Sequence, residues 1–317
     1  MRAFSMRSES APGAASTAGS QVRRRGRLRA PVTVLIAAAL FGLAGAESSA
    51  VASSPARGGP AHAVPAGRVE ILQLPSGDAD GRVREVWVYR PPAAERADLP
   101  VVYFLHGYPG GDRNAESIGL PSLLDQAFGR RHRPFVVAIP DGGSAIHPDT
   151  EWADSVDGQV RLEHFVTDTL VRAVEGPHPR GRRHRAIAGF SMGGYGAMNI
   201  ALRHPGLYGQ VVSIAGYFHP DDPDGMGGGQ AGWASANSPD RLLPNGRRMH
   251  VLLVDAARER DPLIKGEASR FARLARHAGL HPTLAVAPGG HDWPMVGSQV
   301  PTVAHFLDHG WPRRRHP

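Results

Sequence analysis

A single serine stands among closely spaced glycines in residues 185–200, RAIAGFSMGGYGAMNI. Ser191 has a glycine two residues before it, Gly189, and another two residues after it, Gly193. A strand-like apolar run precedes this group and a helical pattern follows it, which predicts a sharp strand-to-helix turn with the serine at its tip. Such a turn exposes the hydroxyl, and the glycines let the two backbones pass closely. The pattern favours a nucleophilic serine over an incidental one.

Two backbone amides are expected to face this serine. The N–H of Met192 lies at the predicted helix N-terminus, where it can stabilise an oxyanion. A second donor is expected from the loop after the strand predicted over residues 99–107, and the N–H of Tyr108 is in that position. His106 precedes the serine in the chain, so we assign it a structural role.

A serine hydroxyl is a weak nucleophile until a base takes its proton, and the base needs a carboxylate to fix its tautomer. The chain has 16 histidines. His291 directly follows the last predicted strand, where its loop can fold back over the C-terminal edge of the sheet. We therefore predict His291 as the base.

Four carboxylates lie in or just beyond the loop that follows the strand predicted over residues 248–256. Asp255 is too close to the strand to reach far, and Glu259 or Glu267 can equally be solvated charges. We favour Asp261, at the entrance to the next predicted helix, and place Glu267 second. The geometry that separates these acids is not contained in the sequence.

A substrate cleft is expected beside these groups. Loop residues that follow predicted strands, or that lie beside the predicted catalytic residues, are predicted to line it: Gly107, Asp112, Trp152 and Trp293. For Asp112 and the segment 151–155, plain solvated loop polarity is an equally good interpretation.

Short apolar runs alternate with helical patterns over most of the chain. Strands are predicted over 83–89, 99–107, 133–143, 183–190, 209–216, 248–256 and 282–290, and helices over 161–176, 192–203, 264–278 and 297–309. This alternation indicates an α/β fold with a mostly parallel sheet and helices on both faces. Residues 219–246 are rich in Gly, Asp and Pro and predict a long loop, either a functional rim or a disordered excursion.

The N-terminal residues differ from the rest in composition. Five arginines in residues 21–30 precede a largely apolar run that ends in small residues, which predicts a secretory signal peptide over residues 1–46. The run is short for crossing a bilayer, which takes about 20 residues, so cleavage is favoured over a permanent anchor. Residues 47–66 predict a disordered linker, 67–312 a catalytic domain and 313–317 a basic tail.

The formal net charge of +7 mainly describes this leader. Residues 1–46 hold seven of the 36 Lys and Arg and one of the 29 Asp and Glu, so 29 basic and 28 acidic residues remain. A body of net charge +1 argues against a nucleic-acid partner. Without any cysteine, an exported protein must be stabilised by core packing and not by disulfides. We expect a secreted or cell-surface protein that contacts a membrane only through the leader, if the leader is uncleaved.

Four motifs in order, FLHGYPGG, VAIPDGG, GFSMGGYGAMNIALRHPGLYGQVVSIAG and GGHDW, resemble the esterase D-like branch of the α/β-hydrolases. That branch includes trehalose mycolyltransferases, feruloyl esterases and formylglutathione hydrolases. The resemblance covers about residues 66–310. It implies an α/β-hydrolase fold, a triad of Ser191, Asp261 and His291, and an oxyanion hole made by the amides of Met192 and Tyr108.

The sequence departs from the mycolyltransferases at two places. Tyr108-Pro109 stands where they have an arginine after the oxyanion-loop glycine, and HDWPMV replaces an aromatic cluster. Their acid is a glutamate further into the helix, which supports Glu267 as the alternative to Asp261. Formylglutathione hydrolases are cytosolic, which argues against that activity in an exported chain.

These observations predict an exported serine esterase that acts on a small-molecule, lipid or glycan ester and needs no metal or organic cofactor. An acyltransferase that delivers the acyl group to a sugar alcohol is the nearest alternative. A non-catalytic surface-binding module on the same fold is the alternative from another class. The ordered serine, acid and histidine argue against that module.

Overall fold

The computed structural model describes residues 66–79, 81–92, 99–129 and 132–312. The predicted leader (1–46), the basic tail (313–317) and all but the last residue of the predicted linker (47–66) lie outside these ranges. Within the described part of the chain, no helix combines the length and the apolar character that a membrane span requires.

One eight-stranded sheet organises the described residues, in the order β1-β2-β4-β3-β5-β6-β7-β8. Its strands are β1 (Arg68–Pro75), β2 (Val83–Arg90), β3 (Val101–Leu105), β4 (Val136–Pro140), β5 (Arg185–Phe190), β6 (Gln210–Ile214), β7 (His250–Ala256) and β8 (Thr283–Ala287). β2 pairs antiparallel with β1 and β4, and every other neighbouring pair is parallel. The predicted α/β class with a mostly parallel sheet is confirmed.

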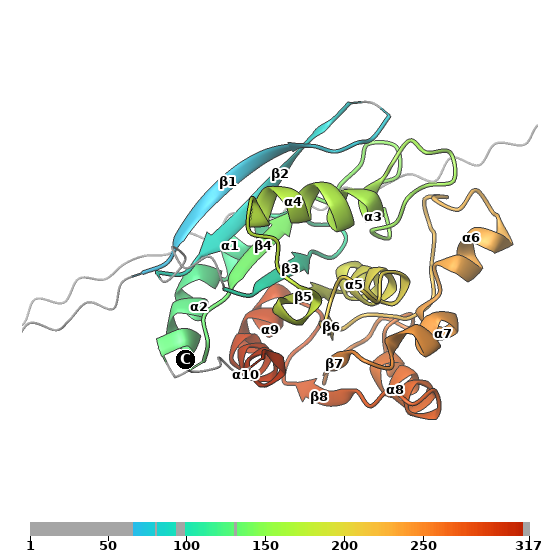
Figure 1. Ribbon diagram of the computed structural model, residues 1–317. Helices are drawn as coiled ribbons and strands as arrows, with labels where there is room; N and C mark the ends of the chain where they lie inside the picture. Colours follow the sequence, from blue (N-terminus) through green and yellow to red (C-terminus); the bar gives the residue numbers. More distant parts are fainter. Residues whose placement is uncertain (1–65, 80, 93–98, 130–131, 313–317) are drawn as a thin grey trace, which may run out of the picture. The chain divides into compact units, whose positions relative to one another are not determined.

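Helices cover both faces of this sheet (Figure 1). In chain order they are α1 (Asn114–Ser117), α2 (Leu120–Gly129), α3 (Leu162–His164), the π-helical turn η1 (Phe165–Thr169), α4 (Leu170–Glu175), the 3₁₀ turn η2 (Arg182–His184), α5 (Met192–Arg203), α6 (Ala231–Ala236), α7 (Pro239–Leu242), the 3₁₀ turn η3 (Leu243–Gly246), α8 (Glu267–His277), α9 (Trp293–Ser298) and α10 (Val300–Gly310). α2, α9 and α10 lie on one face, and α4, α5 and α8 lie on the other.

Several elements differ from the sequence expectation, among them α1 and α2, which were not predicted. β1 was not predicted and adds an antiparallel strand at the sheet edge. The helix predicted over 297–309 corresponds to α10, which has Pro301 in its first turn, and a separate short helix, α9, precedes it. The predicted loop over 219–246 contains the short helices α6 and α7 and the turn η3.

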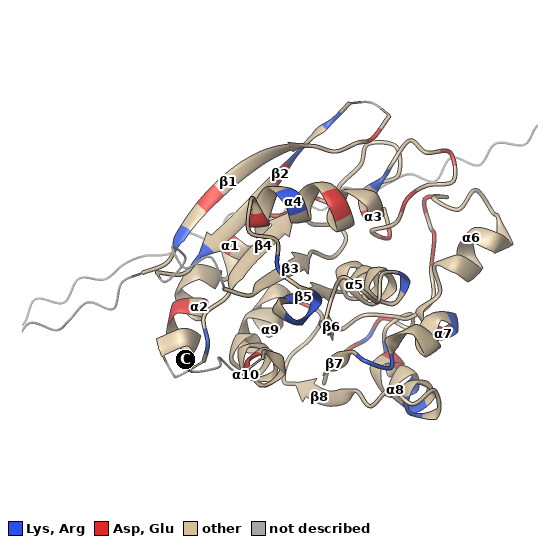
Figure 2. Cartoon of the chain, in the orientation of Figure 1, with Lys and Arg blue, Asp and Glu red and all other residues tan. Residues whose placement is uncertain are grey.

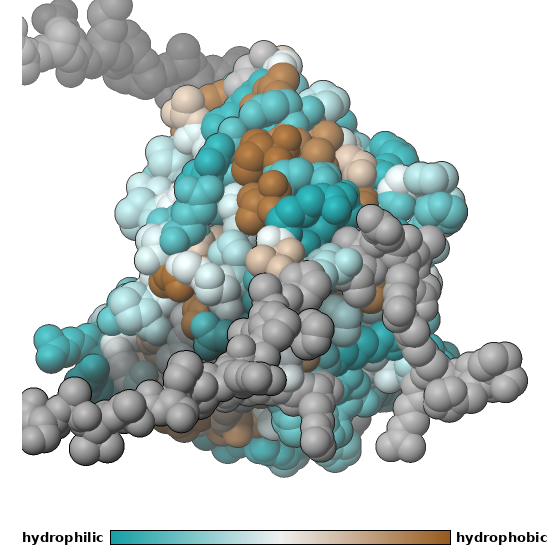
Figure 3. Space-filling model, turned by 90° about the vertical axis from the view of Figure 1, so that its left-hand side faces the viewer, coloured by the Kyte–Doolittle hydropathy of each residue, from teal (hydrophilic) through white to brown (hydrophobic). Residues whose placement is uncertain are grey.

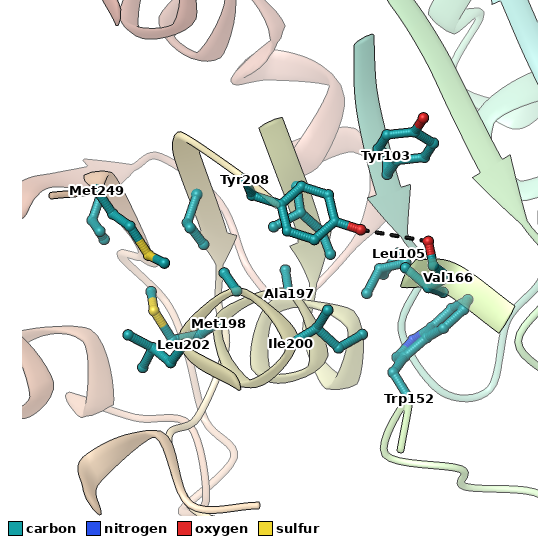
Figure 4. Close-up of a cluster of buried hydrophobic side chains, with 14 of the residues drawn as sticks. Tyr103, Leu105, Trp152, Val166, Ala197, Met198, Ile200, Leu202, Tyr208 and Met249 are labelled. Carbon is teal, nitrogen blue, oxygen red and sulfur yellow. Dashed lines mark hydrogen bonds between the residues drawn. The ribbon is translucent and has the colours of Figure 1, made fainter. Parts of the chain in front are cut away.

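The core has two layers that the alternation along β2 separates. Val86 and Val88 face the layer under α4, α5 and α8, whereas Trp87 and Tyr89 face the layer under α2, α9 and α10. Figure 4 shows the first layer around α5, where Tyr208 donates a long hydrogen bond of 3.5 Å to the carbonyl of Val166. Side chains from α5, β3 and the segment before α3 thus meet in one packed group.

β1 leaves part of its apolar surface in solvent. Val69 is 40% and Ile71 37% exposed, and Figure 3 shows apolar residues gathered among hydrophilic ones on the face at the left of Figure 1, where β1 runs.

The carboxyl ends of the parallel strands lie elsewhere in the sheet. The parallel strands β3, β5, β6, β7 and β8 end at one edge, so the loops that follow them converge there.

Candidate active site

Ser191 occupies the predicted turn between β5 and α5. Its backbone has φ 58° and ψ −123°, a conformation that L-residues rarely adopt. The amide of Ser191 donates to the carbonyl of Ile214 at 2.9 Å, and its carbonyl accepts from the amide of Tyr195 at 3.1 Å. These two backbone hydrogen bonds hold the strained residue between β6 and the first turn of α5.

The flanking glycines are required by close backbone contacts. A Cβ added at Gly189 would overlap the carbonyl group of Gly193, and one added at Gly193 would overlap the carbonyl group of Leu105. The two glycines therefore bring β5, α5 and β3 close enough to form the turn.

His291 lies in the loop between β8 and α9 and reaches the serine. Its Nε2 is 2.8 Å from Ser191 Oγ, a hydrogen-bonding distance. The ring centroid of Phe190 is 4.6 Å from that of His291, with the two planes tilted by 34°. The structure thus brings together the predicted nucleophile and base, 100 residues apart in the chain.

The acid beside His291 is Glu259. Its Oε2 lies 2.7 Å from His291 Nδ1, and its side chain is 4% exposed. Burial raises the pKa of this carboxyl, but hydrogen bonds from the Asp261 amide and from His291 outweigh burial and leave the pKa below its usual value. Glu259 is therefore ionised at neutral pH and can hold the imidazole in one tautomer.

The prediction of Asp261 as the acid is wrong. Its Oδ1 accepts from the amide of Leu263 at 2.9 Å, which turns the short side chain toward the following segment. The amide of Asp261 instead donates to Glu259 Oε1 at 3.0 Å, so this residue supports the acid through its backbone. The alternative, Glu267, starts α8 and pairs with Arg270 at 2.7 Å.

The predicted oxyanion loop lies against the serine. A Cβ added at Gly107 would come within 2.9 Å of Ser191 Cβ, so glycine is needed at this approach. The amide of Met192 is in the first turn of α5, where N–H groups have no intrahelical acceptor. Tyr108 follows Gly107 directly, and its ring is 48% exposed.

His106 is buried beneath this loop and holds it in place, which agrees with the structural role predicted for it. Its Nδ1 lies 2.9 Å from the carbonyl of Gly107, and its Nε2 accepts from the amide of Gly142 at 2.9 Å. Burial lowers the pKa of the His106 imidazole, which keeps it neutral. A neutral ring that donates from Nδ1 and accepts at Nε2 satisfies both contacts.

Comparisons with known proteins agree with this architecture. Residues 78–301 match the family described as "Putative esterase". The chain belongs to this esterase family. The S-formylglutathione hydrolase of Paracoccus denitrificans is 25% identical over 235 residues, which cover 66% of this chain and 82% of the relative. That of Rattus norvegicus is 30% identical over 182 residues, 48% of this chain and 63% of the relative.

Solved structures show that the esterase has an α/β-hydrolase fold. A ferulic acid esterase superposes with a TM-score of 0.67 at 22% identity, covering 78% of this chain and 99% of that one. An S-formylglutathione hydrolase from Agrobacterium tumefaciens gives the same score at 17% identity, with 78% and 96% coverage. The family and the fold together make the chain a hydrolase of esters.

The four residues that were predicted to line the cleft have different surroundings in the structure of the esterase. Gly107 touches the serine, as described above. Trp293 is partly buried, with its ring 5.6 Å from Phe190, and it lines an apolar cavity of about 60 Å³ between the sheet and the helices α2, α9 and α10. Asp112 is buried, and burial together with the nearby Glu85 charge raises its pKa to about 6.

Trp152 does not line a cleft, because its side chain has no exposed surface. Its Nε1 donates to the carbonyl of His106 at 3.0 Å, and its ring is 5.0 Å from the His106 ring, nearly perpendicular to it. A Cβ at Gly142 or Gly196 would overlap the indole. The prediction of a substrate contact is therefore wrong, and Trp152 supports the oxyanion loop from the core.

Glu151 belongs to the segment 151–155, which the sequence suggested as cleft lining or solvated loop, but it is neither. It is fully buried with φ 51°, and its Oε1 accepts from the Tyr217 hydroxyl at 3.0 Å and from the amides of Asp221 and Asp222 at 3.3 Å. It thus anchors the segment that follows β6 at the catalytic edge. Burial, followed by the charge of Asp149, raises the pKa of Glu151 to about 8.

Among the described residues, no group of three or more His, Cys, Asp or Glu side chains is arranged to hold a metal ion. The site is instead built from a hydroxyl, an imidazole, a carboxylate and backbone amides.

We predict that Gly189→Ala destabilises the esterase by about 3 kcal/mol, because the new methyl group overlaps backbone that cannot move away freely. The measurement is urea unfolding followed by circular dichroism. Gly206→Ala is the matched control, since a Cβ there meets no atom within 4 Å. It should change the free energy of unfolding by less than about 1 kcal/mol. Equal losses in both variants would contradict the overlap.

We also predict that Glu151→Gln changes how stability depends on pH. The folded pKa of about 8 lies above the usual value of 4.5, so the favourable contribution of the neutral acid is complete below pH 4.5. It is lost as the pH rises through about 8. The wild type should lose a few kcal/mol over this range relative to Glu151→Gln, measured by urea unfolding at each pH. Parallel pH profiles would contradict the raised pKa.

Proposed function

We propose that this chain is an exported serine esterase that works through an acyl-enzyme on Ser191. The observation that carries the proposal is the continuous hydrogen-bond chain from Glu259 Oε2 through His291 to Ser191 Oγ, with distances of 2.7 and 2.8 Å. The order serine, acid, histidine along the chain is that of α/β-hydrolases. The assembled triad argues against a non-catalytic binding module.

The reaction begins with proton transfer. His291 Nε2 takes the proton of the Ser191 hydroxyl while Nδ1–H donates to the ionised Glu259, which stabilises the imidazolium. The serine oxygen forms a bond to the ester carbonyl carbon. The amides of Met192 and Tyr108 hold the negative oxygen of the tetrahedral intermediate.

Collapse of this intermediate breaks the bond to the alcohol oxygen, which leaves with the proton from His291. Water then gives a proton to His291 and attacks the acyl-enzyme, and the second intermediate releases the carboxylic acid and restores the Ser191 hydroxyl. The cycle uses residues of the chain and water, so the proposal includes no metal or organic cofactor.

The proposed substrate class rests on the family to which the chain belongs. Relatives and neighbours bear the names S-formylglutathione hydrolase and ferulic acid esterase, which supports hydrolysis of an acyl ester or thioester. We propose a small-molecule, lipid or glycan ester for this chain, without a nucleic-acid partner. An acyltransferase uses the same acyl-enzyme and differs only in the acceptor, so product analysis with an added sugar separates the two.

Export rests on the composition of residues 1–46 and on the near-neutral charge of the remaining chain. N-terminal sequencing of protein recovered from the medium tests it. A mature chain that begins after the apolar run supports export, and retention of the protein in the cytosol would overturn it.

Ser191→Ala should abolish labelling by a fluorophosphonate probe and lower the hydrolysis of short-chain p-nitrophenyl esters by about 10³-fold or more. The reason is that this hydroxyl is the one in contact with His291. Ser122→Ala is a suitable control, since Ser122 is an exposed serine of α2. Wild-type turnover in Ser191→Ala would end the proposal.

Glu259→Gln should lower kcat by about 10³- to 10⁴-fold, because a neutral amide neither fixes the tautomer nor stabilises the imidazolium. Asp261→Asn keeps the amide that supports Glu259 and should remain within about threefold of the wild-type rate. Steady-state hydrolysis of the same esters measures both. The reverse ranking of the two variants would restore Asp261 as the acid.

A further inference from the structure

A second concave site lies at the amino ends of the strands, whereas Ser191 lies at their carboxyl ends. A pocket of about 330 Å³ opens where β5, β6 and β7 begin, beside the C-terminal end of α10. Its polar lining consists of Arg182, Arg183, Gln210, Arg248 and His250. β5 separates the two sites, and six strand residues span about 20 Å.

The described residues that line the pocket include three arginines and no acid. Figure 2 shows basic segments directly before β5 and β7, which contain the arginines of the pocket. Arg183 and Arg248 are exposed, and neither forms a salt bridge with a carboxylate of the described residues. The neighbouring Arg185 contrasts with them, because its guanidinium is paired with Glu175 at 2.6 and 2.8 Å.

Arg182 is held in place by backbone carbonyls. Its Nε donates to the carbonyl of Pro205 at 2.8 Å, and its Nη2 donates to the carbonyl of Arg248 at 2.6 Å. Burial lowers the pKa of Arg182, and the charges of Arg248 and Arg183 lower it further. An anion in the pocket would relieve this repulsion among three guanidinium groups.

The wall of the pocket also contains a buried acceptor. Gln210 is 1% exposed, and its Nε2 donates to the carbonyl of Leu307 at 3.0 Å. Its Oε1 is buried and has no hydrogen-bond partner within the described chain. A Cβ built on Gly310 would come within 2.0 Å of this oxygen, so the C-terminal end of α10 packs directly on the Gln210 side chain and closes this wall of the pocket.

We propose that this pocket binds a phosphate group carried by a small molecule, such as glycerol 3-phosphate. A phosphate monoester has close to two negative charges and three acceptor oxygens, which suits several guanidinium groups better than a single carboxylate does. The planar guanidinium matches phosphate oxygens in pairs. The concave shape of the pocket suits a small molecule better than a flat surface.

The test is isothermal titration of the intact protein with sodium phosphate and with glycerol 3-phosphate. Both should bind saturably, and Arg183→Gln/Arg248→Gln should weaken both at least tenfold. Arg273→Gln/Arg276→Gln removes the same charge from exposed positions of α8 that do not line the pocket, and it should bind like the wild type. Hydrolysis of p-nitrophenyl esters should be unchanged in both double variants, because the pocket and Ser191 lie at opposite ends of β5.

Three results would overturn the proposal. The first is no saturable binding of either phosphate to the wild type. The second is equal weakening in the two double variants, which would show an effect of net charge alone. The third is binding of phosphatidylglycerol vesicles, but not phosphatidylcholine vesicles, by a protein that ignores both soluble phosphates, which would point to a membrane surface instead. Each readout is binding, so the outcome is independent of whether Ser191 is the nucleophile.

Discussion

The hydrogen bond between His291 and Ser191 is the contact on which the proposed chemistry depends, and the sheet is what makes it possible. The two residues follow β8 and β5, which are separated by β6 and β7 in the sheet order. The His291 loop must therefore reach back across two strands to bring Nε2 within 2.8 Å of Oγ. Glu259, which follows β7, lies along this path and binds the far side of the imidazole.

Ser191 is held at the meeting point by local strain and close packing. Its positive φ projects the side chain from the turn, and glycine at 189 and 193 removes the atoms that would keep β5 and α5 apart. The packing beneath the turn is equally specific. His106 binds the carbonyl of Gly107 from one side, and Trp152 binds the carbonyl of His106 from the core. The Ser191 turn is thus supported by residues that are themselves buried in the core.

The sequence was sufficient for the fold and for two of the three residues in the hydrogen-bond chain. Ser191 and His291 each follow a predicted strand, and the ends of parallel strands meet at one edge, so their proximity could be expected. Asp261 and Glu259 differ in a way that no pattern reveals. They lie two residues apart in an irregular loop, and their roles depend on which direction each side chain takes. The longer glutamate reaches the imidazole, while the aspartate bonds to its own loop. β1 was missed because it directly follows the predicted linker and none of its side chains is buried, so its pattern lacks the apolar run of a buried strand. The export signal stays a prediction.

Trp152 was predicted as a surface residue for a related reason. Glu151 and Trp152 both have positive φ. Two such residues in succession turn the indole inward, whereas the polar composition of residues 151–155 had suggested a solvated loop. Trp152 has zero exposure and lies 5.0 Å from His106, so it is a natural fluorophore placed directly behind the oxyanion loop. Its indole N–H donates to the carbonyl of His106, so the indole is tied directly to that loop. A movement of the loop that breaks this hydrogen bond would change the surroundings of the indole and therefore its emission.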